Sequence, residues 1–173
     1  MRSLFQVLMI VALAAGARDV WQRHGGLAYK DTKGVAHSLT SPDKPAVVVL
    51  WVTPCPYCAR ALNVLDGLRR EYPKAKLDVV GLYLNTADAA TVDQIAGQEG
   101  HSITMAQGQP THEFVEAMTA HLSFRAPGRD IYVIGKNGKY QAVDSSDLNV
   151  PDDEIAQRVR AILADKHGVK PRA

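Results

Sequence analysis

Two cysteines, Cys55 and Cys58, have the spacing and the setting for redox chemistry, and they are the only cysteines among 173 residues. The β-branched run Ala46–Val52 before them predicts a buried strand, and the residues after them have apolar side chains at helical spacing. Cys55 is therefore expected at a helix N-terminus, where unpaired backbone N–H groups and the helix dipole favour a thiolate. Pro56 suits the first turn, and Cys58 lies close enough to form a disulfide with Cys55. We assign Cys55 as the nucleophile and Cys58 as the resolving thiol.

Two other interpretations of the cysteine pair are an inert short disulfide and half of a metal site. Structural disulfides usually close longer loops, which constrain the unfolded chain more. The chain has no second C-x-x-C, and its histidines do not show the H-x3-5-H spacing of a zinc finger, so no metal ligand is assigned. None of the histidines receives a role; they are His24, His37, His101, His112, His121 and His167.

The elements around the cysteines predict a βαβ unit. Leu77–Leu84 reads as a second buried strand, and because one helix separates it from the first, the two strands are expected to be parallel. A small hairpin is expected before this unit, from Leu27 to Leu39, with Asp31–Gly34 as its turn.

The second half of the chain reads as a helical insertion, a hairpin and a final helix. Asn137-Gly138 is a strong hairpin turn signal, and acidic residues after Pro151 suit the start of a helix. The last six residues, Gly168–Ala173, are expected to fray. The expected elements are helices at Asp88–Glu99 and Thr111–Leu122 with a short apolar patch at Ile103–Met105 between them, strands at Asp130–Ile134 and Tyr140–Val143, and a terminal helix after Pro151.

The first 17 residues, Met1–Ala17, have the pattern of a secretory signal. One cation, Arg2, precedes an apolar run that is too short to span a membrane, and Ala15 and Ala17 form an A-x-A cleavage site. The alternatives are an uncleaved membrane anchor and a buried N-terminal helix. Export would place both thiols where disulfides persist, and residues 18–173 have the length of one domain. The formal net charge of +2 gives no sign of nucleic-acid binding.

Three segments together resemble the thioredoxin-like superfamily: AVVVLWVTPCPYC, LDVVGLYLN and FRAPGRDIYVIGKNGKY. Their order is most similar to the secreted TlpA and ResA branch, and the resemblance covers about Lys33–Asp165. It implies an α/β fold with a central mixed sheet flanked by helices, and a helical insertion before the strand that follows a cis-proline.

The resemblance also implies roles for individual residues. Pro127, with Ala126 before it, matches the cis-proline that faces the active-site disulfide and binds substrate. Trp51 matches the tryptophan that precedes the active-site loop, and Pro56 and Tyr57 would support the site between the cysteines.

The sequence departs from the family pattern at three positions. Val49 stands where thioredoxins have a buried aspartate, and Ala61 stands where cytochrome-maturation reductases often have a glutamate, so no acid is available there to shuttle protons. Gly128 follows the proline where threonine is usual, which suggests a roomier or more mobile groove. The CPYC motif itself is shared with glutaredoxins, so the motif does not fix the direction of electron flow.

The expected function is protein thiol–disulfide exchange in the bacterial envelope, periplasmic or secreted, with reduction slightly favoured because the TlpA-like branch is mostly reducing. The expected partners are protein disulfides or dithiols and a membrane-bound thiol donor or acceptor. No cofactor and no nucleic acid are expected, and membrane association follows only if the leader is retained. The alternatives are a copper-binding chaperone that uses both cysteines, a thiol peroxidase and a glutathione-dependent glutaredoxin. The short cysteine spacing is against a peroxidase.

Overall fold

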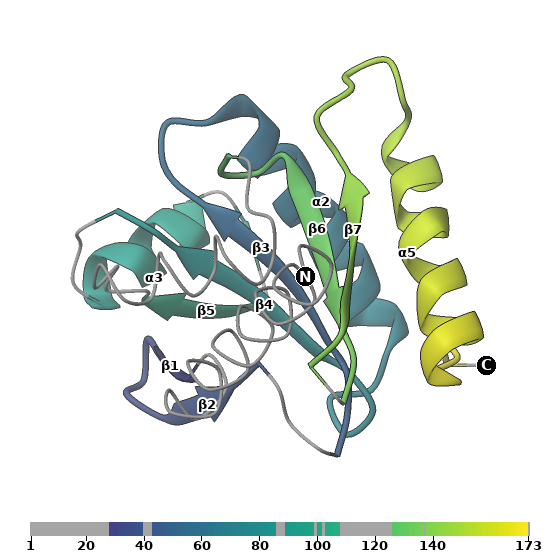
Figure 1. Ribbon diagram of the computed structural model, residues 1–173. Helices are drawn as coiled ribbons and strands as arrows, with labels where there is room; N and C mark the ends of the chain where they lie inside the picture. The colour runs from purple at the N-terminus through teal and green to yellow at the C-terminus, as the bar shows by residue number, and fades with distance from the viewer. Residues whose placement is uncertain are drawn as a thin grey trace, which may run out of the picture.

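The computed structural model describes residues 28–39, 43–85, 89–98, 100–101, 103–107, 126–136 and 138–172. Within them lies one mixed sheet of seven strands in the order β2-β1-β5-β4-β3-β6-β7 (Figure 1). The strands are β1 (Ala28–Asp31), β2 (Ala36–Ser38), β3 (Ala46–Trp51), β4 (Asp78–Tyr83), β5 (Thr104–Gln107), β6 (Asp130–Ile134) and β7 (Tyr140–Asp144). The helices are α2 (Pro56–Glu71), α3 (Ala89–Gln98) and α5 (Asp152–His167). The expected α/β fold with a central mixed sheet is confirmed.

The central strand β3 is buried on both faces along its whole length. Val47, Val49 and Trp51 point into the core formed with α2, α3 and α5, whereas Val48 and Leu50 point into a second apolar cluster on the opposite face. This alternation follows from the two-residue period of a strand. β3 pairs in parallel with β4, as expected, and antiparallel with β6.

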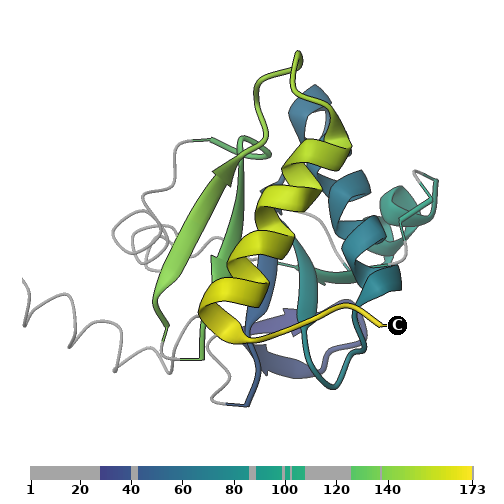
Figure 2. The same ribbon diagram turned by 90° about the vertical axis from the view of Figure 1, so that its right-hand side faces the viewer.

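Helices α2 and α5 pack against one another on the same side of the sheet (Figure 2). Apolar side chains of both helices, among them Leu62, Leu65, Ile155 and Val159, are fully buried between the helices and the sheet. The core therefore holds α2, which carries the cysteines, against the sheet next to β3.

The expected hairpins, β1–β2 and β6–β7, are both present and antiparallel. The sequence predicts no strand for the Ile103–Met105 patch, but Thr104 and Met105 belong to β5, which pairs in parallel with β4 and antiparallel with β1. The expected helix at Thr111–Leu122 lies outside the described residues, as does the leader Met1–Ala17. No helix within the described ranges is long and apolar enough to cross a membrane.

The expectation that the C-terminal residues fray is wrong for Gly168 to Arg172. Gly168 ends α5 in a left-handed conformation, and the Val169 N–H donates to the Leu163 carbonyl at 3.0 Å. The Val169 side chain is buried in the core, and the Arg172 N–H donates to the Glu71 carbonyl at the end of α2, at 2.8 Å. The tail thus fixes the end of α5 to the end of α2.

Candidate active site

Cys55 and Cys58 form a disulfide at the start of α2, with their Cα atoms 5.3 Å apart. Cys55 is the N-cap residue in an extended conformation, and Pro56 occupies the first turn, where a residue without an N–H loses no helical hydrogen bond. Strand β3 ends at Trp51, only four residues before Cys55, so the buried strand and the helix together set the position of the pair.

The two sulfur-bearing residues differ in their access to solvent. Cys58 is 1% exposed and belongs to the core beneath the helix, whereas Cys55 is half-buried. The backbone N–H of Cys58 donates to the Cys55 sulfur at 3.2 Å, and the first turn of α2 contains no acidic residue. A thiolate at Cys55 would therefore face an N–H group and the positive end of a 16-residue helix, without a carboxylate in that turn to oppose it.

The segment Ala126–Arg129, directly before β6, contacts both cysteines of the disulfide. The Pro127 carbonyl oxygen lies 3.8 Å from the Cys55 sulfur, so the structure brings Pro127 to the cysteines as expected. Ala126 is half-buried and accepts a hydrogen bond from the Arg129 N–H, which closes a turn around Pro127. The prediction of a cis peptide bond before Pro127 is wrong. Among the described residues, the cis peptide bond is Thr53–Pro54.

Gly128 packs directly on Cys58, and sequence reasoning missed this contact. Its φ is +69°, and a Cβ added there would lie 2.6 Å from the Cys58 N, 2.7 Å from its Cα and 2.7 Å from its sulfur. A side chain at this position has no room, so the prediction that the glycine widens the groove is wrong. The glycine directly after Pro127 was the sequence signal that could have identified this contact.

Buried hydrogen bonds hold Gly128 in place from both sides. Its N–H donates to the Leu50 carbonyl in β3 at 2.7 Å, and its carbonyl accepts from the Ser145 hydroxyl at 2.9 Å. Ser145 is completely buried, and its N–H donates to the Arg129 carbonyl at 2.8 Å. Ser145 is a second residue that no local pattern identified, because its partner lies 17 positions away.

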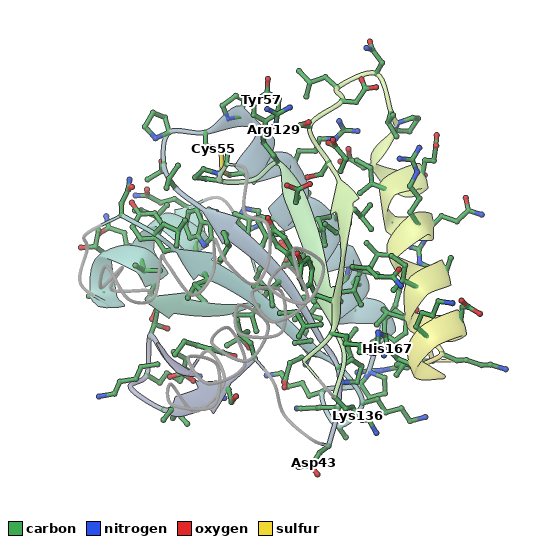
Figure 3. The ribbon with its side chains drawn as sticks, viewed as in Figure 1. Asp43, Cys55, Tyr57, Arg129, Lys136 and His167 are labelled. Carbon is green, nitrogen blue, oxygen red and sulfur yellow. A yellow bond between two sulfur atoms is a disulfide. The ribbon has the colours of Figure 1, made fainter. Side chains whose placement is uncertain are left out.

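The expected supporting residues lie around the pair in different ways. Trp51 is 1% exposed and packs against Tyr83 with ring centroids 4.6 Å apart, so it supports the site from the core. Pro56 is exposed and Tyr57 is half-buried. Figure 3 shows Tyr57 and Arg129 at the same end of the molecule as Cys55. The Asn85 side chain donates to the Thr53 carbonyl at 3.2 Å and braces the loop before the cysteines.

The positions that lack the family acids are fully buried. Val49 and Ala61 both lie in the core cluster that contains Cys58. A buried carboxylate does occur in α2, at Asp66, where it is bonded to the His101 Nδ1 at 2.6 Å. Asp66 is two helical turns beyond Cys58, about 12 Å along the axis, so this pair links α2 to the segment after α3 and does not serve the disulfide.

A wide hollow of about 570 Å³ lies at the opposite end of the molecule. Its lining includes Lys136, Lys139, Lys166 and His167, and Figure 3 shows Lys136 and His167 far from Cys55. It is separate from the cysteine site. No group of three or more His, Cys, Asp or Glu side chains that could hold a metal occurs in the described part of the chain.

Comparisons with known proteins agree with this geometry. The model of the Redoxin family matches residues 17–159. A search of curated protein sequences finds no significant match. Among solved structures, a secreted Mycobacterium tuberculosis disulfide oxidoreductase homologous to E. coli DsbE is similar at 16% identity, covering 78% of this chain and 94% of that one, with a TM-score of 0.54.

Two further structures are similar to this chain in the same way. StoA from Bacillus subtilis is 12% identical over 76% of this chain and 94% of that one, with a TM-score of 0.54. A thiol:disulfide interchange protein from Bacteroides sp. is 14% identical over 82% of this chain and 88% of that one, with a TM-score of 0.61. At such identities these structures establish the thioredoxin-like fold. With a Redoxin model that matches most of its length and a disulfide at the expected C-x-x-C, the chain belongs to the Redoxin family of thioredoxin-like oxidoreductases.

Proposed function

We propose that this protein exchanges disulfides with protein substrates through Cys55 and Cys58. The observation that carries the proposal is the unequal burial of the pair at the start of α2. Cys55 is half-buried and Cys58 is 1% exposed. A substrate sulfur can therefore approach the Cys55 sulfur from solvent but not the Cys58 sulfur. This supports Cys55 as the nucleophile and Cys58 as the resolving thiol.

In the reducing direction, the Cys55 thiolate attacks one sulfur of a substrate disulfide. A Cys55–substrate bond forms, the substrate disulfide breaks, and the other substrate sulfur leaves as a thiolate. The Cys58 thiolate then attacks Cys55, which forms the Cys55–Cys58 disulfide and releases the second substrate thiolate. Two electrons pass from the dithiol to the substrate, and oxidation is the same sequence reversed.

Backbone groups supply the electrostatics of this cycle. The Cys58 N–H, 3.2 Å from the Cys55 sulfur, stabilises the thiolate as a nucleophile and as a leaving group. The Pro127 carbonyl, 3.8 Å from the same sulfur, can accept a hydrogen bond from a neutral Cys55 thiol instead. We propose that Ala126 and Pro127 bind the substrate backbone beside Cys55, and that Trp51, Pro56 and Tyr57 support the site.

The proposed setting is the bacterial cell envelope, with reduction as the favoured direction. The Met1–Ala17 leader pattern supports export, and one structural neighbour is described as a secreted disulfide oxidoreductase. In an oxidising compartment a reductase needs a source of electrons, so we propose a membrane-bound thiol donor as a second partner.

The first test is the reduction potential of the pair, measured by equilibrating residues 18–173 with glutathione buffers and counting free thiols. A value at or below about −230 mV supports the proposed reductase, whereas a value of about −120 to −180 mV indicates an oxidase or isomerase. A cysteine pair that does not interconvert between the dithiol and the disulfide would refute the proposed enzyme activity.

The second test separates the two cysteines. Cys58→Ser should accumulate mixed disulfides with proteins of an envelope extract, because the resolving step is lost. Cys55→Ser should trap none and should show no activity in a disulfide reduction assay. Adducts on the Cys55→Ser variant would reverse the assigned roles.

A further inference from the structure

Charged residues are unevenly distributed between the two ends of the sheet. Segments 43–45, 69–78, 135–136, 138–141 and 165–172 meet at the end opposite the cysteines, where β3 and β4 begin, β6 turns into β7, and α2 and α5 end (Figures 1 and 2). We call these segments the basic end, because they hold ten Lys and Arg against four Asp and Glu. The rest of the chain holds ten against fourteen, so the formal net charge of +2 combines a positive end with a negative remainder.

Contacts between these segments join them into one surface. The Lys44 ammonium donates to the Lys74 carbonyl at 2.9 Å and pairs with the Asp78 carboxylate at 2.8 Å. The Arg172 N–H, which donates to the Glu71 carbonyl, joins the tail to the end of α2. The hollow of about 570 Å³ lies between the end of α5 and the β6–β7 turn, because residues of both line it.

Most acidic side chains of the basic end are already paired with a cation. Three of the four carboxylates form ion pairs, which are Asp78–Lys44, Asp165–Lys166 and Glu71–Arg160. Seven further Lys and Arg side chains are exposed at this end; they are Arg70, Lys74, Lys76, Lys136, Lys139, Lys170 and Arg172. Positive charge is therefore in excess at its surface.

The hollow concentrates part of this charge in a concave site. Its described lining consists of Lys136 and Lys139 from the β6–β7 turn, Tyr140 and Gln141 from β7, and Lys166 and His167 from the last turn of α5. No carboxylate is among these lining residues. Partial burial lowers the pKa of His167 below its usual value of 6.5, so the lysines carry the positive charge of the hollow at neutral pH.

We propose that the basic end docks on an anionic phospholipid surface, with headgroup phosphates entering the hollow between Lys136, Lys139 and Lys166. Charge complementarity supports this partner, because each lysine close to an anionic bilayer contributes to binding and a bilayer can contact several basic segments at once. The inference rests on the proposed envelope setting, which brings the chain to such a surface, and it does not depend on the exchange chemistry.

Docking in this orientation leaves the cysteine site open. Figure 3 shows Lys136 and His167 at one end of the molecule and Cys55 at the other. With the basic end on the bilayer, Cys55 faces away from the membrane, toward protein substrates in solution. Membrane docking and disulfide exchange therefore use separate surfaces and can be tested separately.

The experiment measures co-sedimentation of the protein with two kinds of vesicle, phosphatidylcholine alone and an equimolar mixture of phosphatidylcholine and phosphatidylglycerol. The protein is residues 18–173, which retain every described strand and helix but lack the apolar leader. The test variant is Lys136→Gln with Lys139→Gln. The matched control is Lys30→Gln with Lys33→Gln, because these lysines are also exposed but belong to the β1–β2 hairpin at the other edge of the sheet.

Wild-type protein and the control should bind the anionic vesicles and not the neutral ones. The test variant should bind about thirtyfold more weakly, from about fivefold for each lysine. Raising the salt from about 0.1 M to about 1 M, which shortens the screening length from about 10 Å to about 3 Å, should release the wild-type protein. Equal binding of the two variants, equal binding to both vesicles, or binding that resists salt overturns the proposed docking surface.

Reduction of bis(2-hydroxyethyl) disulfide by the dithiol protein reports the exchange chemistry in the same samples. Vesicle-bound wild type should reduce it at the rate of the free protein, because Cys55 faces away from the bilayer. A large loss of rate on binding would place Cys55 at the membrane and overturn the proposed orientation. Failure of the free protein to reduce this disulfide refutes the exchange function and leaves the docking surface standing.

Discussion

Replacing Gly128 by alanine should strongly destabilise the protein, because the residue combines a left-handed backbone with direct contact with Cys58. The φ of +69° costs an alanine about 1–2 kcal/mol. The added Cβ would lie 2.6–2.7 Å from the Cys58 N, Cα and sulfur, and overpacking of this kind costs about 1–3 kcal/mol more. The expected loss is therefore about 2–5 kcal/mol, a large share of the stability of a domain this size.

Two other glycines separate these contributions. Gly168 has φ +63° and nothing within 4 Å of an added Cβ, so Gly168→Ala tests backbone strain alone and should lose about 1 kcal/mol. Gly67 lies inside α2 with equally open space and no positive φ, so Gly67→Ala should gain about 1 kcal/mol from helix propensity. Gly67→Ala therefore tests neither effect, Gly168→Ala tests backbone strain alone, and Gly128→Ala tests backbone strain and overpacking together.

Urea unfolding of the three variants measures these differences, because the midpoint shifts with stability while the slope stays constant for an unchanged fold. Two of the three atoms that meet the added Cβ belong to the Cys58 backbone, so the Gly128→Ala loss should appear in the dithiol form as well as in the oxidised form. A Gly128→Ala loss no larger than that of Gly168→Ala would refute the contact between Gly128 and Cys58.

Two hydrogen-bonded side-chain pairs outside the site give further predictions. Arg160 donates two hydrogen bonds to Glu71 and lowers the pKa of that carboxylate below its usual value of 4.5, so its contribution is complete above that value and is lost as the pH falls through the lowered pKa. Both side chains are about a third exposed, so Glu71→Gln should cost only about 1 kcal/mol at pH 7, and the unfolding curves of the two proteins should converge once the pH falls below the lowered pKa of Glu71. His101→Ala should cost about 1–3 kcal/mol in denaturant unfolding, because it removes the 2.6 Å hydrogen bond between His101 and the buried Asp66 side chain. A His101→Ala loss below 1 kcal/mol, or a Glu71→Gln difference that grows in acid, would contradict these assignments.

The elements that local patterns specify were predicted well. The β-branched run of β3 and the helical spacing of α2 identify both elements, and the cysteines between them are therefore placed correctly. β5 was missed because Thr104–Gln107 is only four residues long and half polar. Its strand conformation comes from pairing with β4 and β1, and no local pattern carries that information.

The parts of the site that were missed depend on distant contacts. Pro127 meets Cys55 across 72 positions of sequence, and the family resemblance gave the pairing but not the contact between Gly128 and Cys58. The tail after Gly168 contains polar residues and a proline, which do not indicate an ordered segment. Its Arg172 N–H instead satisfies a carbonyl at the end of α2, which depends on how α5 packs against α2.

Among the described residues, the polar groups that contact the Cys55 sulfur belong to the backbone. Val49 and Ala61 are apolar and fully buried, and the polar groups observed at the Cys55 sulfur are the Cys58 N–H and the Pro127 carbonyl. These groups favour opposite protonation states, because the N–H stabilises a thiolate and the carbonyl accepts from a thiol. About 30 mV of potential corresponds to 1.4 kcal/mol, so a change of that size in the balance between these two groups would shift the exchange equilibrium about tenfold. Gly128 holds the Pro127 segment next to the disulfide, because it is hydrogen-bonded to Leu50 and Ser145 and packs on Cys58.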